Sequence, residues 1–370
     1  MNRPLRPATV IEVAQEAGVS TATAARALGN YGRVRDSTRE KVLRAAEKLN
    51  YQANGLARSM ITGRTKSIGV VCGDVHNPFF AGILRGITDV ARTHGYSVLI
   101  ANSDEDWATE VESVRTLSAS AVDGLIVSPA EPKHVEHLEN WSGTGKPLTL
   151  IDRSSATLQT DAVVIDGARA IQDAVTRLFE LGHERVAIVG ELRSAQELDH
   201  VLSLNRRGLD NLDVFTLSPS AARLVGYLRA HTYADKEIDP ALVVRAGEYA
   251  TAAASLATRE LIGIAAAPTA LVTTDNVMTL GAYRALREAG TIIPDQLSFI
   301  GFDNQDWTLL VSPDISVIDQ PDYDMGRTAA TMLLERIEGL NEPPRVVRAA
   351  TSYLERASVA PTTKEAKRKA

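Results

Sequence analysis

The sequence predicts two parts of different fold class: an N-terminal all-α helix-turn-helix domain, and a larger α/β body built from two doubly wound parallel sheets. Three observations lead to this prediction. Residues 1–66 hold 12 Lys and Arg against 5 Asp and Glu, whereas the rest of the chain holds 28 against 41. Two short helical patterns meet at Gly18, and apolar runs alternate with amphipathic segments from Ser67 onward. With 370 residues, 44% of them hydrophobic, the chain is long enough for several cores.

The first thirty residues contain the signals of two short helices joined by a tight turn. Thr9 and Glu12 have the spacing of a capping box, and the apolar pattern that follows them ends at Gly18. Ser20 is expected to cap the next helix, residues 21–28, directly after the turn. Two helices joined so closely are typical of a helix-turn-helix.

A third helix is expected to begin at a second capping box, which Ser37 forms with Glu40. Its buried stripe should consist of Val42, Ala45, Ala46 and Leu49. In the second helix, small and hydroxyl side chains come first and Arg26 follows one turn later. A helix that enters a major groove about 12 Å wide needs such side chains at its N-terminal end. Together with the positive charge, the pattern predicts binding to double-stranded DNA; a three-helix protein-binding module is the alternative.

Residues 54–60, NGLARSM, carry a further short helical pattern, with Leu56 and Met60 on one face and Arg58 on another. So short a helix is unstable alone in water, because helix nucleation is unfavourable. Two interpretations stay open. Either the segment pairs with a second copy of the chain and Met60 opens a base step in the minor groove, or it is a linker.

In the body, seven apolar runs predict strands, and helices are expected over residues 79–94 and about 109–120. The runs are SIGVVC, SVLIAN, GLIVS, LTLID, RVAIVG, ALVTTD and LSFIGF. Ligands of such open sheets bind beyond the carboxyl ends of the strands, and polar loops follow five of these runs. The acceptors, donors and rings that suit a sugar or a nucleoside are Asp275, Asp303, Arg153, Arg223, Phe79 and Phe80.

Signals of catalysis, metal binding and export are missing from the sequence. It has no GxxxxGK[ST], GxSxG or HExxH motif and no GxGxxG after the first strand, so we expect no catalytic residue, metal ligand or cofactor, and no enzyme activity. The one cysteine, Cys72, is expected to be a buried thiol. Neither a signal peptide nor an apolar run of about 18 residues is present, so a cytoplasmic location without a membrane partner is expected.

Ten stretches together resemble the lactose-repressor and purine-repressor family of bacterial transcription factors. In chain order they are IEVAQEAGVSTATAARAL, STREKVLRAAEKLNYQANGLARSM, TGRTKSIGVV, NPFF, GYSVLIANSDED, VDGLIVSP, LGHERVAIVG, TDNVMTLGAYRALREAG, PDQLSFIGFDN and DQPDYDMGRTAATMLLERI. The resemblance spans nearly the whole chain, and the ordered set is highly specific. It implies a body of two subdomains like those of a periplasmic binding protein, with the chain crossing between them near residues 164, 321 and 350.

The resemblance also implies the domain boundaries. Residues 1–52 form the helix-turn-helix domain, 53–66 the hinge helix and linker, 67–360 the effector-binding and dimerisation domain, and 361–370 a basic tail. Within the body, the N-subdomain is expected at about 67–164 and 322–349, and the C-subdomain at about 165–320 and 350–360.

For DNA binding, the resemblance makes Thr21, Ala22 and Arg26 the base-reading residues and Met60 the intercalating hinge residue. The full set of DNA-binding candidates is Thr9, Ser20, Thr21, Ala22, Thr23, Arg26, Asn30, Arg33, Leu56, Ala57, Arg58 and Met60. The chain departs from the family at positions 24 and 25, where Ala-Ala replaces a common Val-Ser and removes a hydroxyl that could contact a phosphate. At position 53 an alanine stands where the family often has proline.

For the effector, the segment SAARLVGY resembles the stretch whose arginine grips the small molecule, so Arg223 is the first candidate. The effector-binding candidates are Asn77, Phe79, Phe80, Asp104, Arg153, Arg223, Thr274, Asp275, Asp303 and Gln320. Two local alternatives stay open: Asp303 with Asn304 could cap a turn, and Asn77 with Pro78 could be a turn before a helix.

Residues 191–217 are the main departure from the family, because roughly two dozen residues stand where relatives have only a few. The segment could be a lid, a partner surface or a neutral excursion beside the cleft.

These inferences predict a homodimeric DNA-binding transcriptional regulator, expected to be a repressor, that binds a palindromic operator. A small sugar-like or nucleoside-like metabolite in the cleft is expected to control it by allostery. The alternatives are a two-lobed small-molecule-binding protein and a ligand-processing enzyme that carries a regulatory DNA-binding head.

Overall fold

The computed structural model describes residues 8–29, 32–51 and 64–362, and it confirms the predicted fold class. The N-terminal part contains helices α1 (Val10–Ala17), α2 (Thr21–Gly29) and α3 (Asp36–Lys48). The capping box of α1 is present: the Thr9 amide donates to Glu12 Oε2 over 2.7 Å, and the Glu12 amide donates to Thr9 Oγ1. Gly18 ends α1 in the left-handed conformation, with φ of 67°.

The second and third helices confirm one expected cap and contradict the other. Ser20 caps α2, because its Oγ accepts a hydrogen bond from the Thr23 amide. The prediction that Ser37 and Glu40 cap α3 is wrong: the N-cap is Arg35, two residues before Ser37, and it makes no side-chain cap. Ser37 therefore lies inside the first turn. The three helices enclose a small core of Val13, Ala14, Ala24, Ala27, Val42, Ala45 and Ala46.

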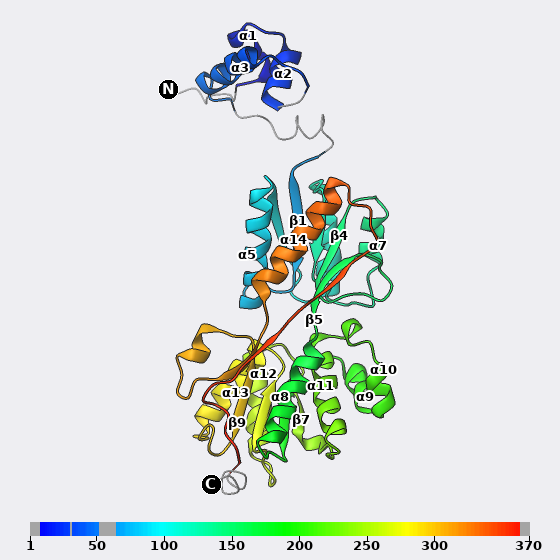
Figure 1. The fold of residues 1–370 in the computed structure, drawn as a ribbon, viewed down its shortest axis with the longest axis vertical. Coiled ribbons are helices and arrows are strands. Elements are labelled where there is room, and N and C mark those ends of the chain that lie inside the picture. Colours follow the sequence, from blue (N-terminus) through cyan, green and yellow to red (C-terminus); the bar gives the residue numbers. More distant parts are fainter. Residues whose placement is uncertain (1–7, 30–31, 52–63, 363–370) are drawn as a thin grey trace. The chain divides into compact units, whose positions relative to one another are not determined.

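The body consists of two lobes, each with one six-stranded sheet (Figure 1). The N-lobe contains β1 (Ser67–Cys72), α5 (Pro78–Thr93), β2 (Ser97–Asn102), α6 (Trp107–Ala119), β3 (Leu125–Val127), α7 (Glu136–Ser142), β4 (Leu148–Asp152), β5 (Asp161–Ile165), α14 (Asp322–Glu338) and β11 (Val346–Ala349). The C-lobe begins with α8 (Gly167–Glu180), β6 (Val186–Gly190), α9 (Ala195–Leu202), α10 (Arg206–Asn211), the 3-10 turn η1 (Val214–Thr216) and α11 (Pro219–Tyr233). It continues with η2 (Pro240–Leu242), β7 (Val243–Arg245), α12 (Thr251–Ile262), β8 (Ala270–Thr273), α13 (Asn276–Glu288), β9 (Ser298–Phe302), η3 (Asp306–Leu309), β10 (Ser316–Asp319) and β12 (Ser352–Leu354).

The two sheets repeat one strand order. The N-lobe order is β11-β5-β4-β3-β1-β2, and the C-lobe order is β12-β10-β9-β8-β6-β7. In the C-lobe sheet, β12 is antiparallel to its neighbour, β10, whereas the other strand pairs are parallel. The chain passes between the lobes three times: after β5, after β10 and between β11 and β12 (Figure 1). The order reverses between β1 and β3 and between β6 and β8, and ligands of such sheets bind at this reversal.

The helices of the lobes pack in close pairs: α5 with α14, α8 with α11, and α12 with α13. Glycines make the close approach possible. A Cβ on Gly86 of α5 would overlap the carbonyl oxygen of Tyr323 in α14, and a Cβ on Gly226 of α11 would overlap that of Ala168 in α8. Substitution at either glycine must therefore push two helix backbones apart.

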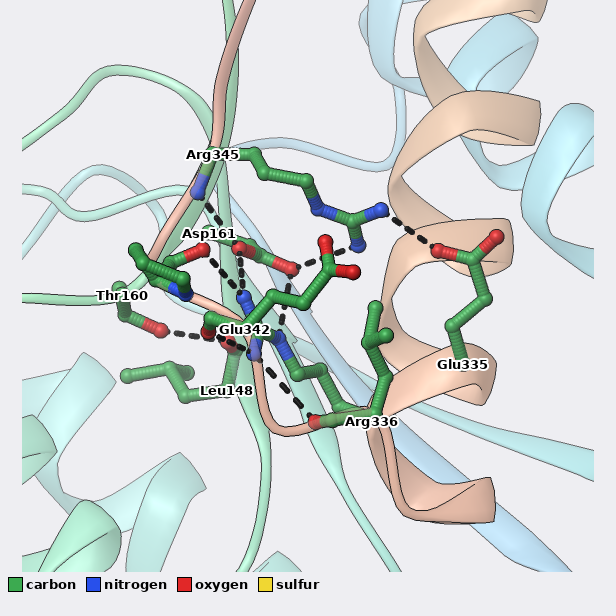
Figure 2. A network of polar contacts seen from close by, with 9 residues as sticks. Leu148, Thr160, Asp161, Glu335, Arg336, Glu342 and Arg345 are labelled. Atoms are coloured by element: carbon green, nitrogen blue, oxygen red, sulfur yellow. Dashed lines mark hydrogen bonds and ion pairs between the residues drawn. The ribbon is translucent and has the colours of Figure 1, made fainter.

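A buried carboxylate at the start of β5 attaches α14 to the N-lobe sheet (Figure 2). The side chain of Asp161, at the start of β5, has no exposed surface. It accepts hydrogen bonds from Arg336 Nη2 at 2.8 Å and from the amide and Nη2 of Arg345 at 2.8 and 3.0 Å. Arg345 Nη1 also pairs with Glu335 of α14 at 2.7 Å. Burial raises the pKa of Asp161, but the hydrogen bonds from Arg336 and Arg345 outweigh it and hold the pKa below its usual value.

Within the described ranges, no helix is long and apolar enough to cross a lipid bilayer.

Candidate functional site

The exposed face of α2 carries small side chains and one arginine. Ala24 and Ala27 are in the core, whereas Ser20, Thr21, Ala22 and Arg26 are exposed. The Ser20 and Thr23 hydroxyls lie 2.8 Å apart, and Arg26 Nε donates to the Ala22 carbonyl oxygen over 3.1 Å. The helix therefore presents a face with little bulk, and its one cation is held back against its own first turn.

The other DNA-binding candidates differ in what the structure says of them. Arg33 is exposed, close to α2 in the chain. Thr9 is half-buried, and its hydroxyl is engaged in the capping box. The candidates that lie outside the described residues are Asn30, Leu56, Ala57, Arg58 and Met60. The hinge interpretation of residues 54–60 stays a prediction.

In the body, hydrogen bonds join loops of the two lobes at the reversal points of the sheets. Asn77 follows β1 and caps the N-terminus of α5. Its Nδ2 donates to the Tyr249 hydroxyl over 2.7 Å. Its Oδ1 accepts from Asn276 Nδ2 over 2.6 Å and from the Phe79 amide over 3.0 Å. Asn77 thus caps a helix and also contacts the C-lobe. The carboxyl ends of β1 and β8 therefore meet across one cleft, where the topology places a ligand.

Two buried aspartates form the C-lobe side of the cleft. Asp275 caps α13 by accepting from the Met278 amide at 2.9 Å. Asp303, with φ of 70°, accepts from Gln320 Nε2 at 2.5 Å and from the Asn276 amide at 3.2 Å. Burial raises the pKa of Asp275, and it raises the pKa of Asp303 to about 6. Both carboxylates can accept hydrogen bonds from a polar ligand.

Arg223 of α11 lies over the ring of Phe302 and lines the same pocket as these aspartates. Only 5% of its surface is exposed. Its Nη1 donates to the Thr274 carbonyl oxygen at 2.5 Å, and its Cζ lies 3.9 Å from the centre of the Phe302 ring. Within the described residues, neither Arg223 Nε nor Gln320 Oε1 has a hydrogen-bond partner. A buried donor and a buried acceptor left open in one cleft are what a polar ligand would satisfy.

Alternating charges line the N-lobe side and the mouth of the cleft. Arg153 Nη2 pairs with Glu105 Oε2 at 2.6 Å, and Arg153 Nε lies 3.4 Å from Asp152 Oδ2. Arg193 pairs with Glu191. Burial raises the pKa of Glu191 to about 7. The negative charges of Asp275 and Glu105 also raise this pKa, whereas the positive charges of Arg193 and Arg153 lower it.

Aromatic rings complete the pocket. Phe79 and Phe80 meet edge to face, with ring centres 5.2 Å apart, and Tyr249 lies opposite in the C-lobe. The arrangement can hydrogen-bond the hydroxyl groups of a ligand and contact an apolar ring face. The predicted residues that line this pocket are Asn77, Phe79, Phe80, Arg153, Arg223, Asp275, Asp303 and Gln320.

Two predicted residues do not line the pocket. Asp104 is exposed and accepts a hydrogen bond from Asn102, and its neighbour Glu105 lines the pocket instead. The Thr274 side chain is fully buried: its hydroxyl donates to Asp275, and only its carbonyl oxygen contacts Arg223. Thr274 therefore supports the pocket from behind, whereas Asp104 lies outside it.

Sequence reasoning missed seven lining residues: Glu105, Asp152, Glu191, Arg193, Pro219, Ser220 and Tyr249. Most of them had a usable signal. Glu105 and Asp152 are neighbours of named candidates, and Glu191 directly follows β6. Tyr249 follows β7, whose short apolar run LVV was not counted as a strand.

Comparison with known proteins agrees with this architecture. The chain matches the bacterial regulatory proteins of the lacI family over residues 9–54, and the periplasmic binding proteins and sugar binding domain of the LacI family over 65–207. It also matches the periplasmic binding protein-like domain over residues 175–359.

Two relatives cover most of the chain. Catabolite control protein A of Priestia megaterium is 31% identical over 326 residues, which cover 88% of this chain and 91% of that protein. The HTH-type transcriptional repressor CytR of Escherichia coli is 30% identical over 332 residues, or 90% of each chain.

Solved structures show the same fold. The lac repressor dimer bound to operator and an anti-inducer has a TM-score of 0.80 and 23% identity, covering 96% of this chain and 100% of that one. The complex of the regulator CelR with cellobiose has a TM-score of 0.66 and 26% identity, covering 95% and 100%. The chain therefore belongs to the lacI family, and it is a DNA-binding transcriptional regulator whose relatives are regulators as well.

Proposed function

We propose that the protein is a cytoplasmic repressor that binds a palindromic operator as a homodimer and responds to a sugar or nucleoside bound in the cleft. The observation that carries the effector proposal is the pair of open polar atoms, Arg223 Nε and Gln320 Oε1, beside the carboxylates Asp275 and Asp303. Hydroxyl groups can donate to the carboxylates and to Gln320, and can accept from Arg223. The residues that line the pocket are proposed to bind this molecule and to catalyse no reaction on it.

On the DNA side, α2 is proposed to lie in the major groove, with Thr21 and Ala22 close to the base edges. Arg26 then exchanges its hydrogen bond to the Ala22 carbonyl for a guanine edge or a phosphate. Two copies related by a two-fold axis read half-sites about one helical turn apart, so the operator is palindromic. The relatives named as repressors and the lac repressor bound to its operator support this assignment.

Two exposed leucines on paired helices support the homodimer. Leu256 of α12 is 57% exposed and Leu280 of α13 is 42% exposed, although the two helices pack closely on each other. Apolar side chains at such positions are better buried against a second copy. The lac repressor structure with the same fold is that of a dimer.

Regulation is proposed to follow from the lobes. An effector shifts an equilibrium only if it binds one arrangement of the lobes more tightly than the other. Asn77 contacts Tyr249 and Asn276 across the cleft, so a ligand that replaces these contacts changes the balance between arrangements.

The test begins by selecting an operator from random duplex DNA with the full chain. We expect a palindromic sequence, a complex of two chains per duplex in sedimentation, and its release or strengthening by at least one sugar or nucleoside of a panel. Release and strengthening distinguish an inducer from a corepressor. Failure to enrich any palindrome would contradict the repressor assignment, and a selected operator whose binding no panel member alters would contradict the effector class.

A further inference from the structure

The segment 191–217 is an ordered part of the C-lobe. It forms α9, α10 and η1, which lie beside α11 (Figure 1). Its apolar residues Val201, Leu209, Val214 and Leu217 are buried in the main core cluster. At its start, Arg245 of β7 donates to the carbonyl oxygens of Leu192 and Arg193, both over 2.7 Å. The segment is thus fixed to the scaffold, as a binding wall must be.

The same segment also contacts the N-lobe. Ser154 Oγ donates to the Phe215 carbonyl oxygen over 3.1 Å, and Arg348 Cζ lies 4.3 Å from the centre of the Phe215 ring. Arg193 Nη1 donates to the Glu105 carbonyl oxygen over 3.4 Å. The segment therefore encloses space between the lobes on its side of the cleft.

That space is a chamber of about 400 Å³. Its walls from the N-lobe are Glu105, Ala130, Glu131, Pro132, Lys133 and Arg153. The opposite wall includes Ser194, Gln196, Glu197 and His200 from the segment and its helix α9. The chamber shares Glu105, Arg153, Glu191, Arg193, Pro219 and Ser220 with the effector pocket, so the two adjoin.

The sizes of the two spaces differ in a way that matters for the ligand. The effector pocket around Arg223 and Asp303 holds only about 50 Å³ of solvent space, against about 400 Å³ in the chamber. Small-molecule sites usually enclose roughly 300–1,000 Å³. The pocket alone falls below this range, and pocket and chamber together lie within it.

The chemistry of the two spaces differs as well. Phe79, Phe80 and Tyr249 line the pocket, whereas none of the described residues around the chamber is Phe, Tyr or Trp. Nucleobases are commonly bound by stacking on aromatic rings, while a hydroxylated ring needs hydrogen-bond donors and acceptors. Gln196, Ser194 and His200 supply both on the chamber wall. The chamber is therefore better suited to a second sugar unit than to a base.

We propose that the effector is a sugar of two or more units, with one unit at Arg223 and the next in the chamber that α9 closes. This inference rests on the proposed function, because it concerns the same effector. It gives the extra segment a role: α9 selects the length of the effector.

The test measures binding to the full chain by calorimetry with a panel of hexoses and pentoses, disaccharides built from them, and the matching nucleosides. Three variants accompany the wild type. Gln196→Trp fills the chamber, Gln196→Ala leaves it open, and Asp199→Trp places the same ring on an exposed position of α9 outside the chamber. Unchanged melting temperatures without ligand show that the variants are folded.

We expect a disaccharide to bind about tenfold or more tightly than its component sugars. Gln196→Trp should remove this advantage while the single unit binds as before. Gln196→Ala should reduce it only in part, because one hydrogen-bonding group is lost while the space stays open, and Asp199→Trp, outside the chamber, should keep it. A nucleoside as the tightest probe, or a disaccharide that binds no better than its unit, would overturn the proposal and leave the proposed function standing. If Gln196→Trp fails to fold, His200→Trp, on the same wall, takes its place. No binding by any probe would count against the effector class and the chamber together.

Discussion

The guanidinium of Arg223 lies over the ring of Phe302, with Cζ 3.9 Å from the ring centre. The ring covers one face of the planar guanidinium, whose N–H groups all lie in its plane and stay available to partners at its edge. One of them reaches the Thr274 carbonyl oxygen, and Nε stays open. Three residues along the same helix, Gly226 sets the close contact with α8, so the position of this cation depends on helix packing.

Replacing Arg223 by alanine should shift the effector response to higher effector concentration and leave operator affinity nearly intact. A charged hydrogen bond contributes about 1.5–3 kcal/mol, so effector binding should weaken by roughly 10- to 150-fold. Operator release in a fluorescence anisotropy titration measures the response. Arg207→Ala, an exposed arginine on α10, is the matched control and should respond as the wild type does. A normal response of Arg223→Ala would remove this residue from the effector site.

Replacing Arg26 by alanine should weaken binding to the selected operator by about 1–3 kcal/mol and reduce the preference over random DNA. The reason is that Arg26 is the one cation on the exposed face of α2. Arg44→Ala on α3 removes an exposed arginine that pairs with Glu40, and it should change binding to both DNAs only slightly. An unchanged ratio of operator to random affinity in Arg26→Ala would show that this residue reads no base.

Replacing Glu191 by glutamine should change how stability depends on pH. The folded pKa is about 7 against an ordinary 4.5, so between these values the folded state retains a proton that the unfolded state has lost. Stability therefore falls as pH rises through this window and levels off above about pH 7. The variant should lose part of this fall, on the order of 1–3 kcal/mol, in urea titrations at pH 5 and pH 8. Glu139→Gln, on the exposed face of α7, should keep the wild-type profile.

Replacing Asp161 by alanine should destabilise the body by about 2–4 kcal/mol, because Arg336 and Arg345 lose a shared buried partner. The exposed pair of Asp324 and Arg327 provides the control. Asp324→Ala should cost less than about 1 kcal/mol, since exposed ion pairs contribute little. Urea unfolding followed by circular dichroism measures both. Equal losses in the two variants would mean that burial of Asp161 adds nothing.

Much of the fold follows from local rules that the sequence obeys. The Thr9 cap, the Ser20 cap and the alternation of strand and helix depend on neighbouring residues, so spacing predicts them. Spacing did not fix where α3 begins, because Asp36 starts the helix and the pattern Ser-x-x-Glu fits equally well one residue inside it. The three-residue strand β7 was missed because its apolar run is too short to distinguish from a loop.

The site could be predicted as a set of loops but not residue by residue. Reasoning from strand ends brought Asn77, Asp275 and Asp303 together, and all three line one pocket. Asp104 and Glu105 both have positive φ, of 53° and 56°, and only the three-dimensional course of that turn decides which side chain enters the cleft. Long-range pairs such as Asn77 with Asn276 lie far apart in the chain, and no local pattern encodes them.

The three passages of the chain between the lobes lie in neighbouring strands: β5 pairs with β11, and β10 pairs with β12. Two lobes joined by one connecting segment could rotate about each other in any direction. Three adjacent connecting segments restrict the lobes to rotation about a single hinge axis. Opening of the cleft should then be a rotation about this axis alone. A small molecule that binds far from the axis can drive this rotation. If any one connecting segment is cleaved, the other two should still define the same axis of rotation.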